Sequence, residues 1–557
     1  MAATLFLGGA VAQSVGAGTI QGSVVDPSGA AIPKATILLS NPLRQFERAV
    51  IADAHGNFDI ENVPLDSYQL IVRAPKFTTS IQEVNVAGTV PLRIQTKLAL
   101  AGTNQTVSVE AAGAIVQTVS PSAHTNVDEA MISAMPQRSP GSGLSDLITD
   151  TSPSVAADSN GFFHPLGDHA QQTFVVDGQP DSDQQSKLFS TSIPANAIQS
   201  LDLITAAPSA EYGDKTSMVV DATTRSGLGS ARPHGDLETY YGAFGTAGEN
   251  GTLSFGSAKF GNFTAVDSER SGRFLDTPEL FPLHDVGTNI VVFNRFDYQP
   301  NNANTFHLDV FGARNNFAIP NTFDQQATSQ DQRQRVLSFN ISPSWQHIFG
   351  PHAVLTANPW VRRDQVDYTP SSNQFADQPA TMGQSRFLTN WGGKLNLAFN
   401  GGGQNLTAGT QIMQTRLEEQ FQLGLTDPLF NAVCVDGNGN PIVAPGVNDP
   451  NNCGAAGARD AANPAFRPGL LPFDLTRSGT LFQFHGSKNI DEYAVYGQDA
   501  VQLGDFTFAA GAREDRYVGL VTYSGFQPRI GGSYRIRKTA SVFRASVSRS
   551  YESPYNE

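Results

Sequence analysis

Apolar and polar residues alternate over many segments in the second half of the chain. In the stretch VLSFNISPSW, the apolar Leu337, Phe339 and Ile341 take every second position, with serine and asparagine between them. The same alternation recurs in three further segments, at residues 306–310, 391–397 and 543–547. Because successive side chains of a strand point to opposite faces, each segment predicts a strand with one apolar and one polar face.

These predicted strands are long, and the connections between them alternate in length. Each strand runs for about 10 to 14 residues, whereas strands of soluble proteins usually have about five or six. Short turns are expected at residues 300–303, 348–351, 400–403, 504–505 and 538–540. Longer loops are expected at residues 269–287, 315–333, 365–384 and 419–488. A tilted strand that crosses a hydrocarbon layer has about this length, and an up-and-down barrel has a short-turn end and a long-loop end.

These features favour an antiparallel transmembrane β-barrel over a secreted all-β array, which alternation alone leaves open. Aromatic residues also lie near the predicted strand ends, at Trp345, Phe349, Tyr493 and Tyr517. Amphipathic rings prefer that interfacial depth of a membrane. Because every backbone N–H and C=O in lipid has to be paired, a spanning sheet has to close. We therefore expect Leu337, Phe339 and Ile341 to face lipid and the serines between them to face the lumen.

About thirteen strands are expected between residues 236 and 551, although bacterial single-chain barrels contain an even number. The thirteenth strand would end on the long-loop side, followed only by YESPYNE. We therefore expect a partial barrel that is truncated at its C-terminal end. The unpaired edges of such a sheet would favour aggregation.

Short strands separated by turn signals fill the first hundred residues. The stretch GTIQGSVVDPSGAAIPKATILLSN predicts a strand, a turn at residues 26–29 and a second strand at residues 35–39. The stretch ADAHGNFDIENVPLDSYQLIVRAPKF repeats this order, with a turn at residues 55–57. Regular short strands indicate a small β-sandwich over residues 18–100. We expect His55, in its turn, to be a solvated loop residue rather than a metal ligand.

Residues 101–228 have a mixed pattern that predicts both helix and strand. In NVDEAMISAM, two methionines are spaced i, i+4 after Asp128 and Glu129, and acids are favoured where a helix begins. The apolar run TFVV ends in the turn signal Asp177-Gly178. We expect a mainly β protein with a sandwich, an α+β middle domain and a partial barrel.

Composition restricts the partners of the chain. Charged residues make up only 16% of the sequence, and the formal net charge is −15. A nucleic-acid partner is not expected, because phosphates require clustered Lys and Arg. No run reaches the roughly 18 apolar residues that a membrane helix needs.

The sequence predicts neither a cofactor nor a catalytic site. The Gly401-Gly402-Gly403 run is not followed by the Gly-Lys-Ser/Thr of a phosphate-binding loop. No Gly-x-Ser-x-Gly elbow occurs in a strand–turn–helix context. Glu418 and Glu419 adjoin at an expected loop start, but neighbouring strand residues point to opposite faces, which is poor geometry for paired acid/base carboxylates.

Two local features concern export. Residues 1–17 contain a short apolar run and an Ala-Val-Ala site, and we interpret them as a signal-peptide remnant. A basic start is missing, so an apolar strand remains the alternative. Cys434 and Cys453 are the only cysteines, and their shared Gly/Asn/Pro-rich loop predicts a disulfide in an oxidising compartment. Two unpaired thiols remain the alternative.

Three sets of motifs carry a resemblance to known families. The pieces G-x-V-x-D-x-x-G from residue 22, D-x-x-G-x-F from residue 53 and P-x-x-x-Y from residue 64 resemble the carboxypeptidase-regulatory-like domain, a transthyretin-like sandwich. MPQRSPGSGLSDLITDTSPSV, FVVDGQP and AIQSLDLITAAPSAEYGDKTSMVVDATTRSG resemble the plug of TonB-dependent outer-membrane receptors. YAVYGQDAVQLGDFTFAAGARED and FQPRIGGSYRI resemble their barrel. The order of these regions, with the carboxypeptidase-regulatory-like domain before the plug and the barrel, is similar to that in the Oar-like subgroup of these receptors.

The resemblance implies a sandwich at residues 18–100, a plug at 101–228 and a barrel at 229–557. The plug motif would include Asp177, Gly178, Glu211, Tyr212 and Gly213. Barrels of this class have about 22 strands, so about nine are missing from this sequence. The resemblance also implies that the protein lies in the outer membrane of a Gram-negative type of cell, with lipid around the barrel. The sandwich and the plug would be accessible from the periplasm.

The resemblance further implies a receptor that imports an external ligand with energy supplied by a TonB-type periplasmic protein. The TonB contact would be the extended segment Thr106, Val107, Ser108, Val109 and Glu110, which could add as a strand to a partner. The last strand or linker of the sandwich is the alternative interpretation. A surface binding, adhesion or assembly protein without active transport is the alternative function. Loop residues such as Tyr368, Asn373 and Phe375 are compatible with glycan binding, but this composition is typical of any solvated loop.

Overall fold

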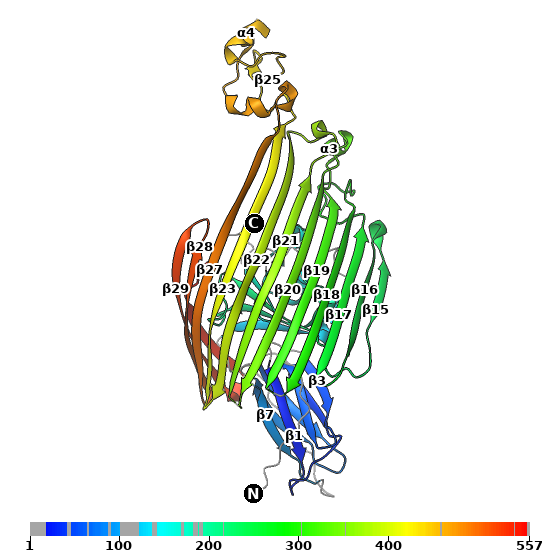
Figure 1. Ribbon diagram of the computed structural model, residues 1–557, viewed down its shortest axis with the longest axis vertical. Helices are drawn as coiled ribbons and strands as arrows, with labels where there is room; N and C mark the ends of the chain where they lie inside the picture. Colours follow the sequence, from blue (N-terminus) through cyan, green and yellow to red (C-terminus); the bar gives the residue numbers. More distant parts are fainter. Residues whose placement is uncertain are drawn as a thin grey trace.

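The computed structural model contains a small sandwich, a plug and a curved wall of long strands (Figure 1). It describes residues 18–41, 46–63, 66–86, 91–100, 122–135, 142–168, 172–181, 188, 193–214, 217–301, 303–350, 352–456, 459–539 and 541–553. The expected signal remnant at residues 1–17 and the expected TonB contact at residues 106–110 lie outside the described residues.

Two sheets form the N-terminal sandwich. One has the order β4-β1-β7, with β1 (Gly18–Val25), β4 (Asn57–Val63) and β7 (Leu92–Lys97). The other has the order β3-β2-β5-β6, with β2 (Thr36–Asn41), β3 (Phe46–Ile51), β5 (Asp66–Arg73) and β6 (Ser80–Val86). Apolar side chains from both sheets are fully buried between them, among them Ile20, Ile37, Leu70 and Val72. The predicted β-sandwich is confirmed.

Two aspartates build equivalent turns in this sandwich. The Asp26 carboxylate accepts hydrogen bonds from the backbone N–H groups of Ser28 and Ala30, at 2.8 and 2.9 Å. The Asp53 carboxylate repeats the arrangement two strands later, with the N–H of His55 at 2.8 Å. Aspartate favours such turns because its short side chain can bond to backbone two residues ahead. His55 is an exposed turn residue.

The plug is an α+β domain built on a five-stranded sheet of order β12-β11-β14-β13-β8. Its strands are β8 (Ala123–Asp128), β11 (Gln172–Val176), β12 (Gln179–Pro180), β13 (Ile198–Ala206) and β14 (Met218–Thr224). Two short strands pair beside it, β9 (Val155–Ala157) and β10 (Phe163–Pro165). The helices are α1 (Glu129–Ala134) and α2 (Gly143–Thr151), with 3-10 turns η1 (Ser159–Gly161) and η2 (Ala195–Ala197). The predicted helix is α1, and its cap Asp128 accepts a hydrogen bond from Met131 N at 2.8 Å.

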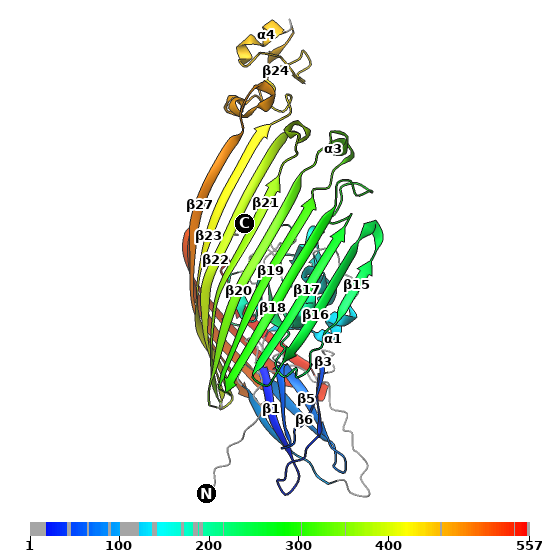
Figure 2. The same ribbon diagram turned by 45° about the vertical axis from the view of Figure 1, so that its right-hand side comes forward.

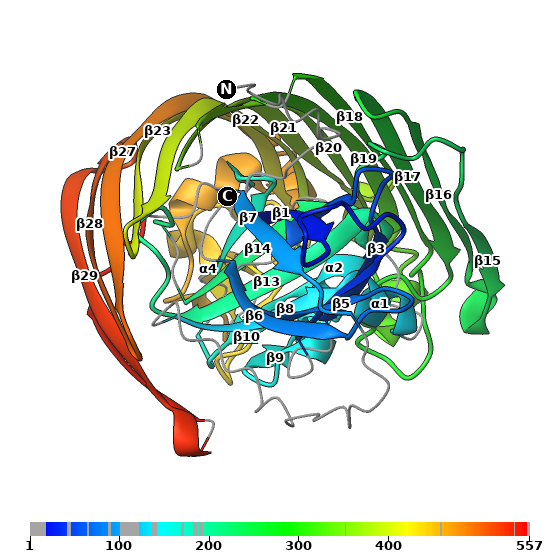
Figure 3. The ribbon, with the colours of Figure 1, turned by 90° about the horizontal axis from the view of Figure 1, so that it is seen from below.

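Thirteen antiparallel strands form the wall, in sequence order from β15 to β30. They are β15 (Leu237–Tyr241), β16 (Ala247–Gly256), β17 (Phe260–Ser271), β18 (Gly287–Asn301), β19 (Asn304–Ala318), β20 (Arg333–Phe349), β21 (Ala353–Thr369), β22 (Ala380–Gly401), β23 (Gln404–Leu425), β27 (Phe482–Leu503), β28 (Phe506–Val518), β29 (Thr522–Ile536) and β30 (Ser541–Ser548). The predicted number of strands is confirmed. The wall curves around the plug as an arc, with β15 at one edge and the β29–β30 side at the other (Figure 3).

The two faces of the wall alternate as expected in β20. Phe339 and Ile341 point outward and are 47% and 37% exposed. Ser338 and Ser342 point inward and are buried, because the plug fills the space that the wall encloses. The prediction that apolar residues face outward and serines face the lumen is confirmed.

Three details of the sequence prediction are wrong. The connections at residues 242–246 and 519–521 lie on the long-loop side but are short. The strands reach further than expected, so Glu418 and Glu419 lie within β23, and Tyr368 lies within β21. The reason is that backbone pairing continues beyond the apolar stretch, where charged side chains pair across neighbouring strands. The expected aromatic end positions hold for Trp345, Phe349 and Tyr517 but not for Tyr493, which lies in the middle of β27. Tyr517 is buried at 1% exposure, so its ring does not lie on the outer surface.

Long-loop connections carry further small elements. They are η3 (Ala243–Gly245), α3 (Phe323–Ala327), η4 (Gln374–Ala376), β24 (Cys434–Val435), β25 (Pro441–Ile442), η5 (Pro450–Asn452), α4 (Cys453–Ala456), β26 (Ala461–Ala462), η6 (Pro468–Phe473) and η7 (Leu475–Arg477), and η8 (Arg537–Thr539) lies on the short-turn side. The elements from β24 to η7 form a lobe at the end of the molecule opposite the sandwich (Figures 1 and 2). No described helix combines the length and apolar character needed to span a membrane.

Candidate functional site

The turn between β11 and β12 docks the plug onto the wall. Asp177 and Gly178 have φ angles of 46° and 84°, the left-handed conformation that an Asp-Gly hairpin turn supplies. The side-chain amides of Gln179 and Asn340 in β20 exchange two hydrogen bonds, at 2.8 and 3.0 Å. The Asn358 amide in β21 donates to the Asp177 carbonyl at 3.3 Å. The predicted turn is therefore a contact between plug and lumen wall.

A buried ionic cluster surrounds this turn. Arg295 in β18 is fully buried and lies 2.9 Å from Asp297 and 3.4 Å from Asp177 of the plug. Its guanidinium also donates to the Thr224 hydroxyl of the plug at 3.0 Å. The Ser226 hydroxyl donates to Asp297 at 2.6 Å. One wall arginine thus connects the β11–β12 turn and β14 of the plug through hydrogen bonds.

A second cluster repeats this chemistry on β21. Arg362 binds Asp364 of its own strand, at 2.8 and 3.0 Å, and forms an ion pair with Asp181 of the plug. Its guanidinium also lies over the Phe311 ring, 5.6 Å from the ring centre. All three charged groups are buried. Charges removed from water in this way are stabilised only by close partners, so each pair fixes the position of the plug.

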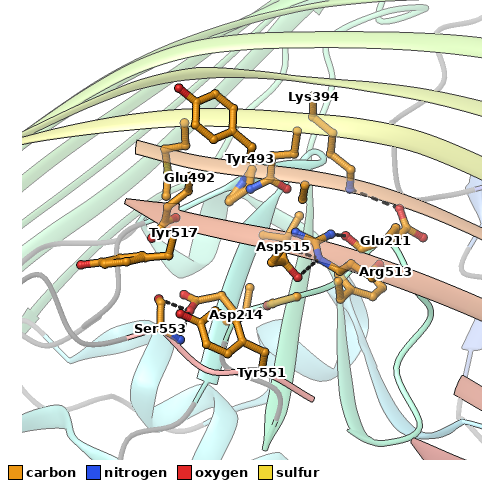
Figure 4. A pocket seen from close by; sticks show the side chains of 18 of the residues that line it. Glu211, Asp214, Lys394, Glu492, Tyr493, Arg513, Asp515, Tyr517, Tyr551 and Ser553 are labelled. Atoms are coloured by element: carbon orange, nitrogen blue, oxygen red, sulfur yellow. Dashed lines mark hydrogen bonds and ion pairs between the residues drawn. The ribbon is translucent and has the colours of Figure 1, made fainter. Parts of the chain in front are cut away.

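Glu211, Tyr212 and Gly213 are the remaining predicted plug residues. They lie against β22, β28 and β29 of the wall, and Figure 4 shows Glu211 there. The Glu211 carboxylate lies 3.2 Å from Lys394 Nζ of β22, and its backbone carbonyl accepts a hydrogen bond from Arg513 of β28 at 2.9 Å. Arg513 in turn binds Asp515 at 2.8 Å. A Cβ on Gly213 would lie 2.2 Å from Arg513 Nε, so the close approach favours glycine at this position.

Tyr212 is held through both its side chain and its backbone carbonyl. Its hydroxyl donates to Asp221 of β14 at 2.7 Å, and Lys394 Nζ lies 5.7 Å from its ring centre. The Tyr212 carbonyl accepts a hydrogen bond from Arg529 of β29 at 2.7 Å. Arg529 also donates to the Pro208 carbonyl at 2.9 Å. This segment of the plug is therefore held by cations from three wall strands.

A small pocket lies between plug and wall beside this segment. Charged groups from both sides line it, including Glu211, Lys394, Glu492, Arg513 and Asp515. Figure 4 shows Lys394 and Arg513 of the wall directed toward Glu211 of the plug, with Glu492 lying apart beside Tyr517. Such an interface can exchange its contacts with water, which an apolar interface cannot do without cost.

Sequence analysis missed the wall side of the interface. Arginine and aspartate occur two positions apart on three strands, as Arg295-x-Asp297, Arg362-x-Asp364 and Arg513-x-Asp515. We call these the three R-x-D pairs. Two positions apart on a strand means the same face, so each pair presents both charges to the lumen. The signal is visible in the sequence, but their plug partners are specified only by the folded register.

The other predicted residues lie away from this interface. Cys434 and Cys453 are bonded to each other in the lobe, with Cα atoms 5.6 Å apart. Asn373 caps the 3-10 turn η4, in which Phe375 is half exposed. The Tyr368 hydroxyl donates to Gln332 at 2.6 Å. The structure does not bring these residues together into one ligand site.

Comparisons with known proteins agree with this architecture. Residues 19–99 match the carboxypeptidase regulatory-like domain, and residues 235–557 match the TonB dependent receptor-like β-barrel. The chain is 25% identical over 234 residues to the TonB-dependent transporter Oar of Myxococcus xanthus. This match covers 41% of the present chain and 22% of the relative.

Solved structures show the same fold at low sequence identity. The unliganded ferric citrate transporter FecA is 12% identical, with a TM-score of 0.53, over 75% of this chain and 61% of that chain. The FrpB iron transporter of Neisseria meningitidis is 12% identical, with a TM-score of 0.52, over 74% and 61%. The chain thus spans less than a quarter of the curated relative and under two thirds of either solved transporter. Its barrel match covers more than half of its own length, and the chain belongs to the TonB-dependent receptor family.

Proposed function

We propose that the protein imports an external ligand through the outer membrane by rearranging its plug. The barrel fold of the family implies the outer membrane. The observation that carries the proposal is the chemistry of the plug–wall contact, which rests on arginine, lysine and carboxylate pairs around the plug. Because water can replace such polar contacts, the plug can shift on the side of β22, β28 and β29. On the side of β17 to β19 its apolar core packs against Phe263, Phe293 and Phe311 of the wall.

The proposed direction of transport follows from the two ends of the molecule. Long loops and the disulfide-bonded lobe lie at one end, and short turns and the sandwich lie at the other (Figure 1). Barrels of bacterial outer membranes have long external loops and short periplasmic turns. We therefore place the lobe outside and both the sandwich and the plug within reach of the periplasm. Residues 1–17 would then direct export.

The energy would come from a partner. We propose that residues 106–110 add as a strand to a TonB-type periplasmic protein, since extended β-forming segments bind exposed sheet edges in this way. Pulling on a segment just before β8 would act on the plug sheet, in which β8 pairs with β13. The proposal includes no catalytic role, because the family comprises receptors and transporters.

The ligand belongs to one of three classes: glycan, peptide or metal chelate. The lobe is the proposed capture surface, because it exposes apolar side chains such as Phe430 and Val443, at 57% and 52%. Aromatic and amide side chains on the neighbouring loops, such as Phe375 and Asn373, would suit a glycan. Growth of a deletion strain on candidate glycans, peptides and iron chelates identifies the class.

A reversible lock on the plug tests the proposal. Gln179→Cys with Asn340→Cys places thiols on the two sides of the docked turn, where a cleavable bifunctional methanethiosulfonate reagent can join them. We expect ligand uptake to stop after cross-linking and to return after reduction, while surface binding persists. Gln346→Cys with Thr356→Cys, a cross-strand pair within the wall, is the matched control.

Two results would contradict import through plug movement. Uptake that continues with the turn cross-linked would show that the plug need not move. Ligand binding with no uptake in the unmodified protein would favour the alternative, a surface binding or assembly protein without active transport.

A further inference from the structure

Three potential metal ligands meet where the plug turn touches β19. They are Asp177 of the plug, and His307 and Asp309 of the wall, and their donor atoms all lie within 4.8 Å of one another. His307 Nε2 lies 3.7 Å from the Asp309 carboxylate. All three residues are buried, at 2%, 4% and 3% exposure. The cluster therefore joins plug and wall in a place without solvent.

The charges around this cluster do not balance. The Asp177, Asp297 and Asp309 carboxylates face the single guanidinium of Arg295, so two negative charges remain when all three carboxylates are ionised and His307 is neutral. Uncompensated buried charges are strongly unfavourable. A divalent cation is the smallest single addition that makes the cluster neutral.

One buried atom of each of the two wall ligands, His307 and Asp309, also lacks a hydrogen-bond partner. Among the described residues, neither His307 Nε2 nor Asp309 Oδ1 has one. The neighbouring cluster around Arg362 differs, because no side-chain atom of Arg362, Asp181 or Asp364 is left buried without a partner. An unpaired imidazole nitrogen facing carboxylates is the arrangement that a metal ion satisfies.

We propose that Asp177, His307 and Asp309 bind one divalent transition-metal ion, for which Zn²⁺ fits best, between plug and wall. An imidazole nitrogen with two carboxylate oxygens suits zinc, whereas Mg²⁺ and Ca²⁺ prefer oxygen ligands alone. Tetrahedral zinc with bonds of about 2.1 Å separates its ligands by about 3.4 Å, close to the His307–Asp309 distance. A small closure of Asp177 completes the set.

The surrounding residues orient the proposed ligands. Asp177 accepts hydrogen bonds from the backbone N–H of Thr224 at 3.2 Å and from its hydroxyl. Arg295 holds Asp177 and Asp297 together from the other side. Such outer partners fix ligand carboxylates in metal sites. Because one ligand comes from the plug and two come from the wall, the bound ion favours the docked plug.

Metal content measures the site directly. The detergent-extracted protein is stripped with a chelator, loaded with Zn²⁺ and freed of excess metal, and zinc per chain is measured by mass spectrometry. We expect one zinc per chain, and at least a tenfold weaker affinity by calorimetry in His307→Ala and in Asp309→Asn. His347→Ala is the matched control, because His347 is a histidine of the neighbouring strand that contacts Asn304 instead.

A second measurement needs no substitution. Zinc K-edge absorption of the loaded protein should show one imidazole, oxygen ligands and no sulfur. The proposal is overturned if no stoichiometric zinc remains, or if His307→Ala and Asp309→Asn bind zinc as the unmodified protein does. Protons shared between the carboxylates would then neutralise the cluster. A spectrum with several imidazoles would also contradict it, because the cluster contains one.

Discussion

Single residues hold the plug through the three R-x-D pairs of the wall. In each pair the aspartate of the same strand orients the arginine, and the arginine reaches a plug acceptor: Asp177, Asp181 or the Glu211 carbonyl. The arginine is therefore the residue whose loss leaves buried carboxylates unpaired. Removing one partner of a buried ion pair costs more than the pair itself contributes.

Arg362 and Arg363 provide a matched comparison, because they are neighbours on opposite faces of β21. Arg362→Met removes the buried cation that pairs with Asp181 and Asp364, and we expect the docked plug to be destabilised by about 3–5 kcal/mol. Arg363→Met removes an exposed side chain that stacks on Phe387, and we expect a change below about 1 kcal/mol. The urea dependence of backbone hydrogen exchange in β11 and β14 measures the stability of the docked plug in each of the two variants. Equal effects of the two substitutions would contradict the role of Arg362.

Asp59 makes the stability of the sandwich depend on pH. Burial and the nearby Asp53 charge raise its pKa from 3.8 to about 6, although a hydrogen bond from Gln21 acts in the opposite direction. A carboxyl with a raised folded-state pKa contributes stability that is complete below pH 4 and is lost as the pH rises through about 6. We expect Asp59→Asn to stabilise the sandwich at pH 7 by about 1–2 kcal/mol and to flatten its pH profile.

Thermal unfolding of residues 18–100 between pH 4.5 and 7.5 measures this effect. The sandwich encloses its own core, so the isolated segment is a suitable sample. His55→Ala is the control, since it removes an exposed side chain from a turn of the same sandwich. An unchanged pH slope in Asp59→Asn would show that another group is responsible.

At the level of elements, the alternating pattern predicted which segments are strands but not where each strand ends. Apolar side chains mark the part of β20 that faces lipid, around Phe339 and Ile341. Strand pairing continues beyond that part, where Arg386 and Glu419 pair across β22 and β23 inside the lumen. The physical reason is that backbone hydrogen bonds do not require apolar side chains. Loop bounds drawn from polarity were therefore too wide.

Depth along β20 determines the effect of a charge on its outer face. Ile341 lies at the middle of the strand, and Phe349 lies at its end. We expect Ile341→Lys to destabilise the inserted wall by about 2–4 kcal/mol and Phe349→Lys by about 0–1 kcal/mol. The folded fraction, followed by heat-modifiable gel mobility over a urea series, measures the difference. Equal costs at both positions would contradict the assignment of mid-strand to mid-membrane.

At the level of the whole molecule, sandwich, plug and wall were predictable from sequence because each has its own pattern. Short strands with aspartate turns, a mixed segment and long alternating strands follow one another along the chain. The contacts between these bodies were not predictable. Glu211 and Arg513 lie far apart in sequence, and only the curvature of the wall brings them together. The lobe was not predictable either, because its core has few apolar residues.

The lobe should depend on its disulfide while the wall does not. Its core is small and includes both cysteines, with Val433, Ala444 and Phe466. A disulfide that closes a loop of this length contributes about 3 kcal/mol. We expect Cys434→Ala with Cys453→Ala to make residues 426–481 sensitive to protease, with unchanged heat-modifiable mobility of the wall. Loss of wall folding in this variant would contradict the independence of the lobe.

Oxygen accessibility along β20 measures whether one face of the wall contacts lipid while the other faces the plug. Each position from Leu337 to Ser342 is replaced in turn by a spin-labelled cysteine, and relaxation by oxygen dissolved in the lipid is measured in reconstituted membranes. The account predicts high oxygen accessibility at residues 337, 339 and 341, and low accessibility at 338, 340 and 342, which face the plug. Accessibility without a two-residue period, or high values at 338, 340 and 342, would contradict a lipid-facing wall around a plug.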